Sequence, residues 1–295
     1  STPYFIRRSR GFVPTPINLN IDCEGVFAAG AELTSCFSIG KGNEAILSPY
    51  IGDLKNFETY LFYDEVFKRY SHLFRFKPSF VAVDLHPNYH STIYGTEIGV
   101  DTISVQHHYA HILSVMAEHN IVEPIIGVAF DGTGLGTDDK IWGSEFMVCT
   151  PYDFKRIGHF DYIPLPGGDK VVYEPWRTGV SLLYKIFGEK FLDFDIPINK
   201  KIGRQQIENI IKLINSNTNS PLSCSAGRLF DAIAAILGVC TKSSYHAEAP
   251  MKLESLISNN SDNFILPFDI NNYIFSYDEM IVEILDLLKK GYEVD

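Results

Sequence analysis

Three histidines, His107, His108 and His111, lie within five residues of one another. If this stretch is helical, His107 and His111 lie one turn apart on the same face. Two imidazoles at that separation can ligate one divalent cation, and carboxylates from elsewhere in the chain would complete the ligand shell. His108 points about a third of a turn away and is not predicted to be a ligand. Alternatively, His107 caps the helix and the other two pack or face water, but the clustering favours the metal-binding interpretation.

A second candidate is the acidic, glycine-rich segment that starts at Asp131, directly after the apolar run PIIGVAF. Glycines let backbone N–H groups approach an anion closely, so Gly132, Gly134 and Gly136 predict a phosphate-binding turn over residues 132–139. Asp131, at the end of the preceding strand, can hold a cation that neutralises the phosphate. A plain hairpin turn is the alternative. The segment is neither a Walker A loop nor a Rossmann fingerprint.

A third candidate is the segment SAGRLFD, which opens an apolar helix. Gly227 and Asp231 share one helical face. The glycine would permit close approach of a nucleotide, and the carboxylate could accept hydrogen bonds from ribose hydroxyls. In the alternative, Gly227 only packs the helix against a neighbour and Asp231 pairs with Arg228 at i, i+3. These residues alone favour the alternative.

The elements that must position these residues follow from the spacing of apolar side chains. Residues 56–74 have the pattern of an amphipathic helix, with Asn56 as its N-cap. The apolar run over 79–85 predicts a buried strand that ends in Asp84, and 124–131 predicts another. The remaining expected strands are 26–29, 34–39 and 45–47, which form an antiparallel meander, together with 142–149 and 155–163. The remaining expected helices are 108–120, 175–187, 202–214, 226–237 and 277–290.

This order of elements predicts an α/β fold in two parts. The pattern of residues 21–123 restarts at 124, which suggests a two-lobed actin-like ATPase (ribonuclease-H-like) fold, in which ATP binds between the lobes; a generic α/β fold is the alternative. Residues 1–20 are rich in proline and basic residues and are expected to be a linker. The second lobe, 124–295 with helical insertions, is expected to be truncated at its C-terminus.

Composition excludes several classes of protein. The net charge of −11 over 295 residues argues against a general nucleic-acid binder, which needs excess Lys and Arg. The five cysteines have no C-x-x-C spacing, so we expect reduced thiols in a cytoplasmic protein. No apolar stretch approaches the roughly 18 residues that a membrane span requires.

In order and spacing, six segments resemble the carbamoyltransferase portion of the HypF family of nickel–iron hydrogenase maturation proteins. The resemblance covers residues 5 to 256. The segments are IRRSRGFVPTPI, VAVDLHPNYHST, VQHHYAHILSVMAEH, GVAFDGTGLGTDDKIWGSEF, LPGGDKVVYEPWR and SAGRLFDAIAAILG. The resemblance implies the actin-like fold, shared with the enzymes that make threonylcarbamoyl-adenosine in tRNA and with antibiotic O-carbamoyltransferases.

The resemblance also implies a reaction. Carbamoyl phosphate and ATP give carbamoyl-adenylate, and the carbamoyl group then passes to the C-terminal cysteine of a partner maturation protein, HypE. By position, His107, His111 and Asp131 would ligate a divalent metal (zinc, iron or magnesium). Residues Gly132, Thr133, Gly134 and Gly136 would face the phosphates, and Gly227 and Asp231 the adenosine.

The sequence departs from the family pattern at both ends. We expect the YrdC-like module, which makes carbamoyl-adenylate in the family, to lie upstream of this sequence or to act in trans, and RRSRG resembles the end of that module. An Asp-Gly-Gly segment that supplies another metal-site carboxylate is also missing, so one ligand is expected to be lacking. The alternatives are a transferase that acts on a small molecule or on tRNA, the latter disfavoured by the acidic charge, and a non-catalytic nucleotide- or metal-binding fragment.

Overall fold

The computed structural model describes residues 8–257, 265–292 and 294; residues 1–7 of the expected linker lie outside them. The chain divides into two compact units, Ser1–Pro124 and Ile125–Asp295. Each unit has its own sheet, helices and hydrophobic core, so the predicted α/β class is confirmed.

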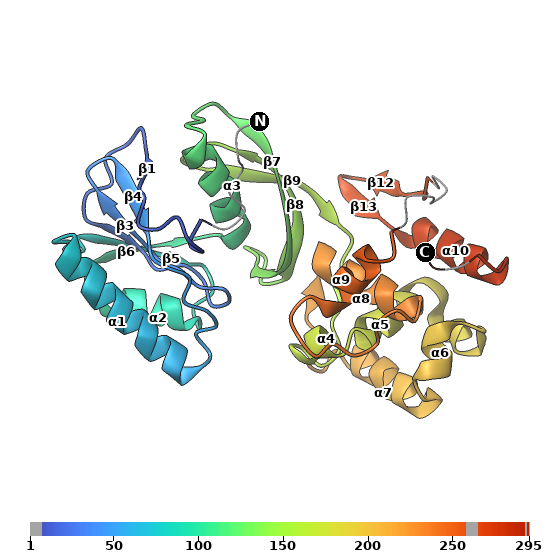
Figure 1. Cartoon of the computed structure of the whole chain (residues 1–295). Helices are drawn as coiled ribbons and strands as arrows, with labels where there is room; N and C mark the ends of the chain where they lie inside the picture. The colour runs from blue at the N-terminus through green and yellow to red at the C-terminus, as the bar shows by residue number, and fades with distance from the viewer. Residues whose placement is uncertain (1–7, 258–264, 293, 295) are drawn as a thin grey trace. The chain divides into compact units, whose positions relative to one another are not determined.

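The first unit is built on a six-stranded sheet in the order β1-β4-β3-β2-β5-β6 (Figure 1). The predicted meander is confirmed, although its second strand begins at Ser38 rather than at Thr34, whose φ is +48°. Strands β2, β5 and β6 run parallel, and their pairing sets Asp84 opposite Val105. The strands are β1 (Ile17–Asn18), β2 (Val26–Ala28), β3 (Ser38–Lys41), β4 (Glu44–Leu47), β5 (Phe80–Asp84) and β6 (Asp101–Val105).

The helices of the first unit are α1 (Phe57–Leu73), α2 (His90–Glu97) and α3 (His107–Glu118). The predicted cap is confirmed, since the Asn56 side chain accepts hydrogen bonds from the backbone N–H groups of Glu58 and Thr59. Helix α1 buries Tyr63 and Val66 against the sheet, in a core rich in aromatic side chains. Figure 1 shows α1 and α2 on the same side of this sheet.

In the second unit, the described strands form a sheet in the order β10-β11-β8-β9-β13-β12, with β7 also paired to β8. Strands β7, β8 and β9 are antiparallel, and β11 runs parallel to β8. The strand pairing of β11 with β8 therefore brings the start of the following helix close to the β7–β8 hairpin. The strands are β7 (Ile125–Leu135), β8 (Ile141–Cys149), β9 (Phe154–Phe160), β10 (Ile163–Pro164), β11 (Leu222–Ser223), β12 (Asp269–Asn271) and β13 (Ile274–Ser276).

The helices of the second unit form a group with its own apolar core (Figure 1). The four predicted helices of this region are present with small differences at their ends. The elements are α4 (Lys170–Tyr173), α5 (Trp176–Phe187), the 3-10 helix η1 (Gly188–Asp193), α6 (Pro197–Lys201), α7 (Arg204–Asn215), α8 (Ala226–Ile236), α9 (Glu248–Glu254) and α10 (Asp278–Lys289). In the part of the chain that the structure describes, no helix combines the length and apolar character needed to cross a bilayer.

The glycine-rich turn predicted over residues 132–139 is wrong in extent. Strand β7 continues through Leu135, and the pairing of β7 with β8 shifts register between Phe130 and Gly134. The first part of the segment is therefore a β-bulge, and the reversal of direction is confined to the residues between Leu135 and Ile141. A bulge adds residues to one strand and re-aims their side chains.

Candidate functional site

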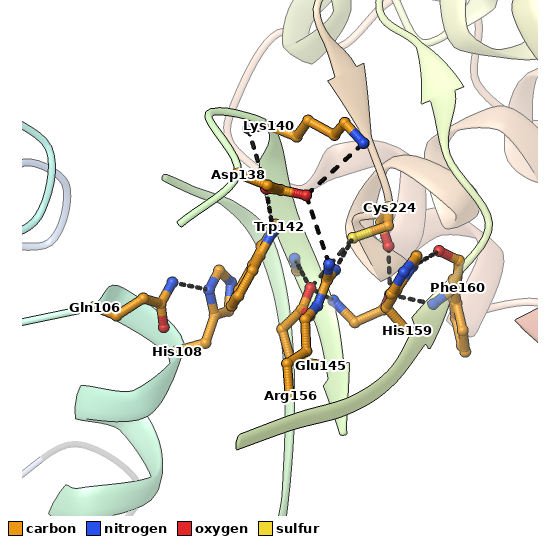
Figure 2. Close-up of polar contacts among 12 residues, drawn as sticks. Gln106, His108, Asp138, Lys140, Trp142, Glu145, Arg156, His159, Phe160 and Cys224 are labelled. Carbon is orange, nitrogen blue, oxygen red and sulfur yellow. Dashed lines mark hydrogen bonds and ion pairs between the residues drawn. The ribbon is translucent and has the colours of Figure 1, made fainter. Parts of the chain in front are cut away.

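The histidine cluster lies at the start of α3, so the helical premise of the metal-site prediction is confirmed. The N-cap is Gln106, whose side-chain oxygen accepts a hydrogen bond from the Tyr109 N–H at 2.9 Å. The Gln106 amide nitrogen lies 3.1 Å from Nδ1 of the buried His108 (Figure 2). His107 is thus not the cap, and His108 belongs to the packed face of the helix.

The Nε2 atoms of His107 and His111 lie 3.3 Å apart. Two nitrogen ligands about 2.0–2.1 Å from a tetrahedral zinc ion are separated by about the same distance, roughly 3.3 Å. The separation of the two nitrogens therefore matches that of two ligands on one cation.

A carboxylate fixes the orientation of the first imidazole. Nδ1 of His107 lies 2.7 Å from Oδ2 of the buried Asp84. The other carboxylate oxygen accepts the backbone N–H of His86 at 2.8 Å, which holds the Asp84 side chain in place. With Nδ1 donating to Asp84, Nε2 is the ring atom left with a lone pair for a metal. Asp84 was noted in the sequence only as the end of a strand, and its role depends on the pairing of β5 with β6.

In the second unit, the second and third sequence motifs meet. The Ser225 hydroxyl lies 2.6 Å from the carbonyl oxygen of Asp131 and 2.9 Å from that of Gly132. A Cβ on Gly227 would lie only 2.9 Å from the Gly132 Cα, and one on Gly143 would lie 2.6 Å from the Asp131 carbonyl oxygen. These glycines therefore let the start of α8 pack directly on the bulge, which gives Gly227 a packing role.

Asp231 and Arg228 form the i, i+3 pair that the sequence offered as an alternative. Oδ2 of Asp231 lies 2.6 Å from Nη1 of Arg228 and forms an ion pair with it. Neither atom makes a hydrogen bond within the described residues. Burial raises the pKa of Asp231 to about 6, and the positive charge of Arg228 only partly offsets this effect. A binding role for Asp231 stays a prediction.

The raised pKa of Asp231 predicts a specific dependence of stability on pH. The native carboxyl holds its proton more tightly than the unfolded one, whose pKa is about 3.9. Its contribution to stability is therefore fully present below pH 4 and is lost as the pH rises through 6. Between pH 4.5 and pH 7 we expect the free energy of unfolding of the wild type to fall by about 2 kcal/mol relative to that of Asp231→Asn. Urea unfolding of both proteins at each pH measures this difference, and parallel curves would contradict it.

A buried polar network lies in the same unit (Figure 2). The Glu145 side chain is fully buried and accepts hydrogen bonds from the backbone N–H groups of Gly143 and Ser144. Its other oxygen accepts Nε of Arg156 at 2.5 Å, and the Cys224 thiol lies 3.2 Å from Oε1. Burial and the Glu145 charge raise the pKa of Cys224 to about 12. This thiol is therefore protonated and unsuited to act as a nucleophile.

The network extends to the turn between β7 and β8 through Asp138. Its carboxylate accepts the Trp142 indole N–H at 2.7 Å and the Tyr162 hydroxyl at 2.8 Å, and it lies 3.7 Å from Arg156. Burial acts to raise the pKa of Asp138, but the hydrogen bonds from Tyr162 and Trp142 lower it overall. The Arg156 guanidinium also stacks on Trp142 at 4.0 Å. This network was not predicted from the sequence, in which its one signal is a glutamate in the mostly apolar strand β8.

Within the units, the structure brings two groups of predicted site residues together. In the first unit, His107 and His111 lie next to each other, and Asp84, which was not predicted, contacts His107. In the second unit, Gly227 lies against Gly132 in the bulge that includes Asp131 and Thr133, and Gly134 and Gly136 follow in the same hairpin.

Both units match families of known proteins. Residues 22–118 match the HypF Kae1-like domain, and residues 127–295 match the family described as carbamoyltransferase, Kae1-like domain, second subdomain. The resemblance inferred from the motifs is thus confirmed.

Curated relatives and solved structures agree with these matches. Carbamoyltransferase HypF of Rhizobium leguminosarum bv. viciae is 38% identical over 86% of this chain, which covers 33% of that protein. A carbamoyltransferase HypF homolog of Cupriavidus necator is 33% identical over 87% of this chain and 66% of its own length. A crystal structure of full-length HypF in the phosphate- and nucleotide-bound form superposes with a TM-score of 0.90 at 35% identity, covering 97% of this chain and 45% of that one. The chain thus spans about a third of the first of these relatives.

Proposed function

Because the chain belongs to the HypF carbamoyltransferase family, we propose that it carries the transfer step of that family's reaction. It passes the carbamoyl group of carbamoyl-adenylate to the C-terminal cysteine thiol of a HypE-like protein during hydrogenase maturation. A YrdC-like module, upstream or in trans, makes carbamoyl-adenylate from carbamoyl phosphate and ATP. The five free cysteines are in keeping with a cytoplasmic location.

One observation carries this proposal: the paired Nε2 atoms of His107 and His111, with Asp84 fixing the first ring. These imidazoles would hold a divalent metal (zinc, iron or magnesium), for which Asp131 would supply a third ligand. When bound, the metal acts as a Lewis acid that polarises the carbamoyl group and stabilises negative charge on the leaving phosphate.

The remaining predicted residues hold the nucleotide. Gly132, Thr133, Gly134 and Gly136 face its phosphates, and Gly227 and Asp231 face the adenosine. A full-length HypF to which this chain is similar has been crystallised with phosphate and nucleotide, which supports a nucleotide as a ligand in this family. In the transfer, the thiolate sulfur attacks the carbamoyl carbon, a C–S bond forms and the bond to the AMP phosphate breaks. AMP leaves with that bonding pair, and the thiol proton passes to solvent.

The test is transfer to a peptide that ends in cysteine. The chain, loaded with metal, is incubated with carbamoyl-adenylate and this peptide, and with a peptide ending in serine as the matched control. We expect AMP release together with carbamoylation of the cysteine peptide and not of the serine peptide. Mass spectrometry of the peptides measures the carbamoylation. Transfer to a small alcohol in place of the thiol would identify an O-carbamoyltransferase. Nucleotide binding without any AMP release would identify a non-catalytic binding module.

A further inference from the structure

Arg228 is a buried arginine whose guanidinium lies at the bulge in β7. Packing alone does not require a charged side chain at this position. Its side chain is 10% exposed. Nη2 lies 3.2 Å from the position that a Cβ on Gly132 would take, so the guanidinium rests against the backbone of the bulge. Within the described residues, neither Nε nor Nη1 makes a hydrogen bond, although Nη1 is ion-paired with Asp231.

This arrangement is costly unless a ligand uses it. A guanidinium carries five N–H donors, and Asp231 faces only Nη1, so the buried Nε–H has no acceptor among the described residues, which is unfavourable. Arg228 also lies in the first turn of α8, an eleven-residue helix whose free N–H groups and dipole favour negative charge at that end. A cation, a helix N-terminus and a glycine-rich bulge therefore converge beside Gly132, and each favours an anion with several oxygens.

We propose that Arg228 binds a phosphate group of the nucleotide at the Asp131–Gly136 segment. The inference rests on the proposed function, which places a nucleotide there. The planar fork of arginine matches a pair of phosphate oxygens, which a lysine cannot do. The phosphate competes with Asp231 for the same guanidinium. Arg228 thereby distinguishes a phosphorylated nucleoside from the bare nucleoside.

The experiment compares the affinities of AMP and adenosine, measured by calorimetry on the 295-residue chain and its variants. Loss of a hydrogen-bonded charge contact costs about 1.5–3 kcal/mol, which corresponds to roughly a tenfold to hundredfold change in affinity. We expect Arg228→Gln to weaken AMP binding by this factor and to leave adenosine binding unchanged. Arg204→Gln is the matched control, because Arg204 is an exposed arginine of α7 that pairs with Asp193 and Glu208.

Each result has a distinct meaning. An Arg228→Gln protein that loses AMP and adenosine affinity equally, or loses neither, overturns the assignment of Arg228 while the nucleotide site stands. A wild-type chain that binds AMP and adenosine with equal affinity overturns the assignment of Arg228 as well, because no phosphate is then recognised. Wild type that binds neither overturns the proposed nucleotide site itself. If Arg228→Gln does not fold, Arg228→Lys keeps the charge without the fork, and an intermediate loss confined to AMP is the expected result.

Discussion

Replacing His111 with alanine is expected to remove bound divalent metal from the purified chain. The two Nε2 atoms are spaced for one cation, so removal of one ligand leaves a site that cannot hold it. We expect the metal affinity to fall by more than about a hundredfold, since even the outer-shell partners of metal ligands are worth about 10–100-fold. Elemental analysis and titration against a chelator measure the loss. His119→Ala is the matched control, because His119 is an exposed histidine at the end of the same helix.

Asp84→Asn provides a graded comparison with this variant. The substitution keeps the shape of the side chain but removes the charge that fixes the His107 ring, so we expect the affinity to fall by about 10–100-fold rather than to vanish. The unfolding midpoint of the metal-free protein reports any loss of structure. A wild-type chain without metal would show that the histidines are structural. Equal affinities of wild type and Asp84→Asn would limit Asp84 to a structural role.

The second large effect is expected from Glu145→Gln. This substitution removes the buried carboxylate that pairs with Arg156, whose side chain is 18% exposed, and leaves the guanidinium only the longer contact of 3.7 Å with Asp138. Breaking one side of a buried ion pair costs about 3–5 kcal/mol. Urea unfolding followed by tryptophan fluorescence measures it, since both tryptophans of the chain, Trp142 and Trp176, lie in the second unit. The exposed pair of Glu65 and Arg69 on α1 supplies a control, and Glu65→Gln should change the midpoint little.

A double variant separates charge from packing at this position. If the cost comes from an uncompensated charge, Glu145→Leu combined with Arg156→Met should recover much of the stability lost in Glu145→Gln, because apolar replacements of both partners are often neutral. A double variant as unstable as the sum of the single variants would instead assign the loss to the backbone contacts of Glu145 with Gly143 and Ser144.

The helical histidine pair could be predicted from sequence because its geometry is local. Spacing of four residues fixes a shared face once the helix forms, and apolar periodicity predicted that helix. Asp84 could not be assigned in the same way. It meets His107 only because β5 pairs in parallel with β6, and β6 has mostly exposed side chains without an apolar signal.

The second unit shows the same limit. The motifs around Asp131 and Gly227 could be recognised only as separate segments. For Gly227, the residues alone favoured a packing role, and in the structure this glycine does pack against Gly132. Their contact depends on the pairing of β11 with β8, two strands far apart in the sequence. The partnership of Glu145 with Arg156 depends on a shift of register between β8 and β9, which no local pattern encodes.

The hydrogen bond from Ser225 to Asp131 joins residues 94 positions apart. Closing a chain segment of that length costs about 4 kcal/mol of entropy beyond a constant, and long-range contacts of this kind form slowly. The β7–β8 hairpin closes locally, whereas the start of α8 reaches the bulge only after the intervening strands and helices have collapsed. The contact between α8 and the bulge, where we propose that a nucleotide binds, is therefore the part of the second unit that a folding chain completes late.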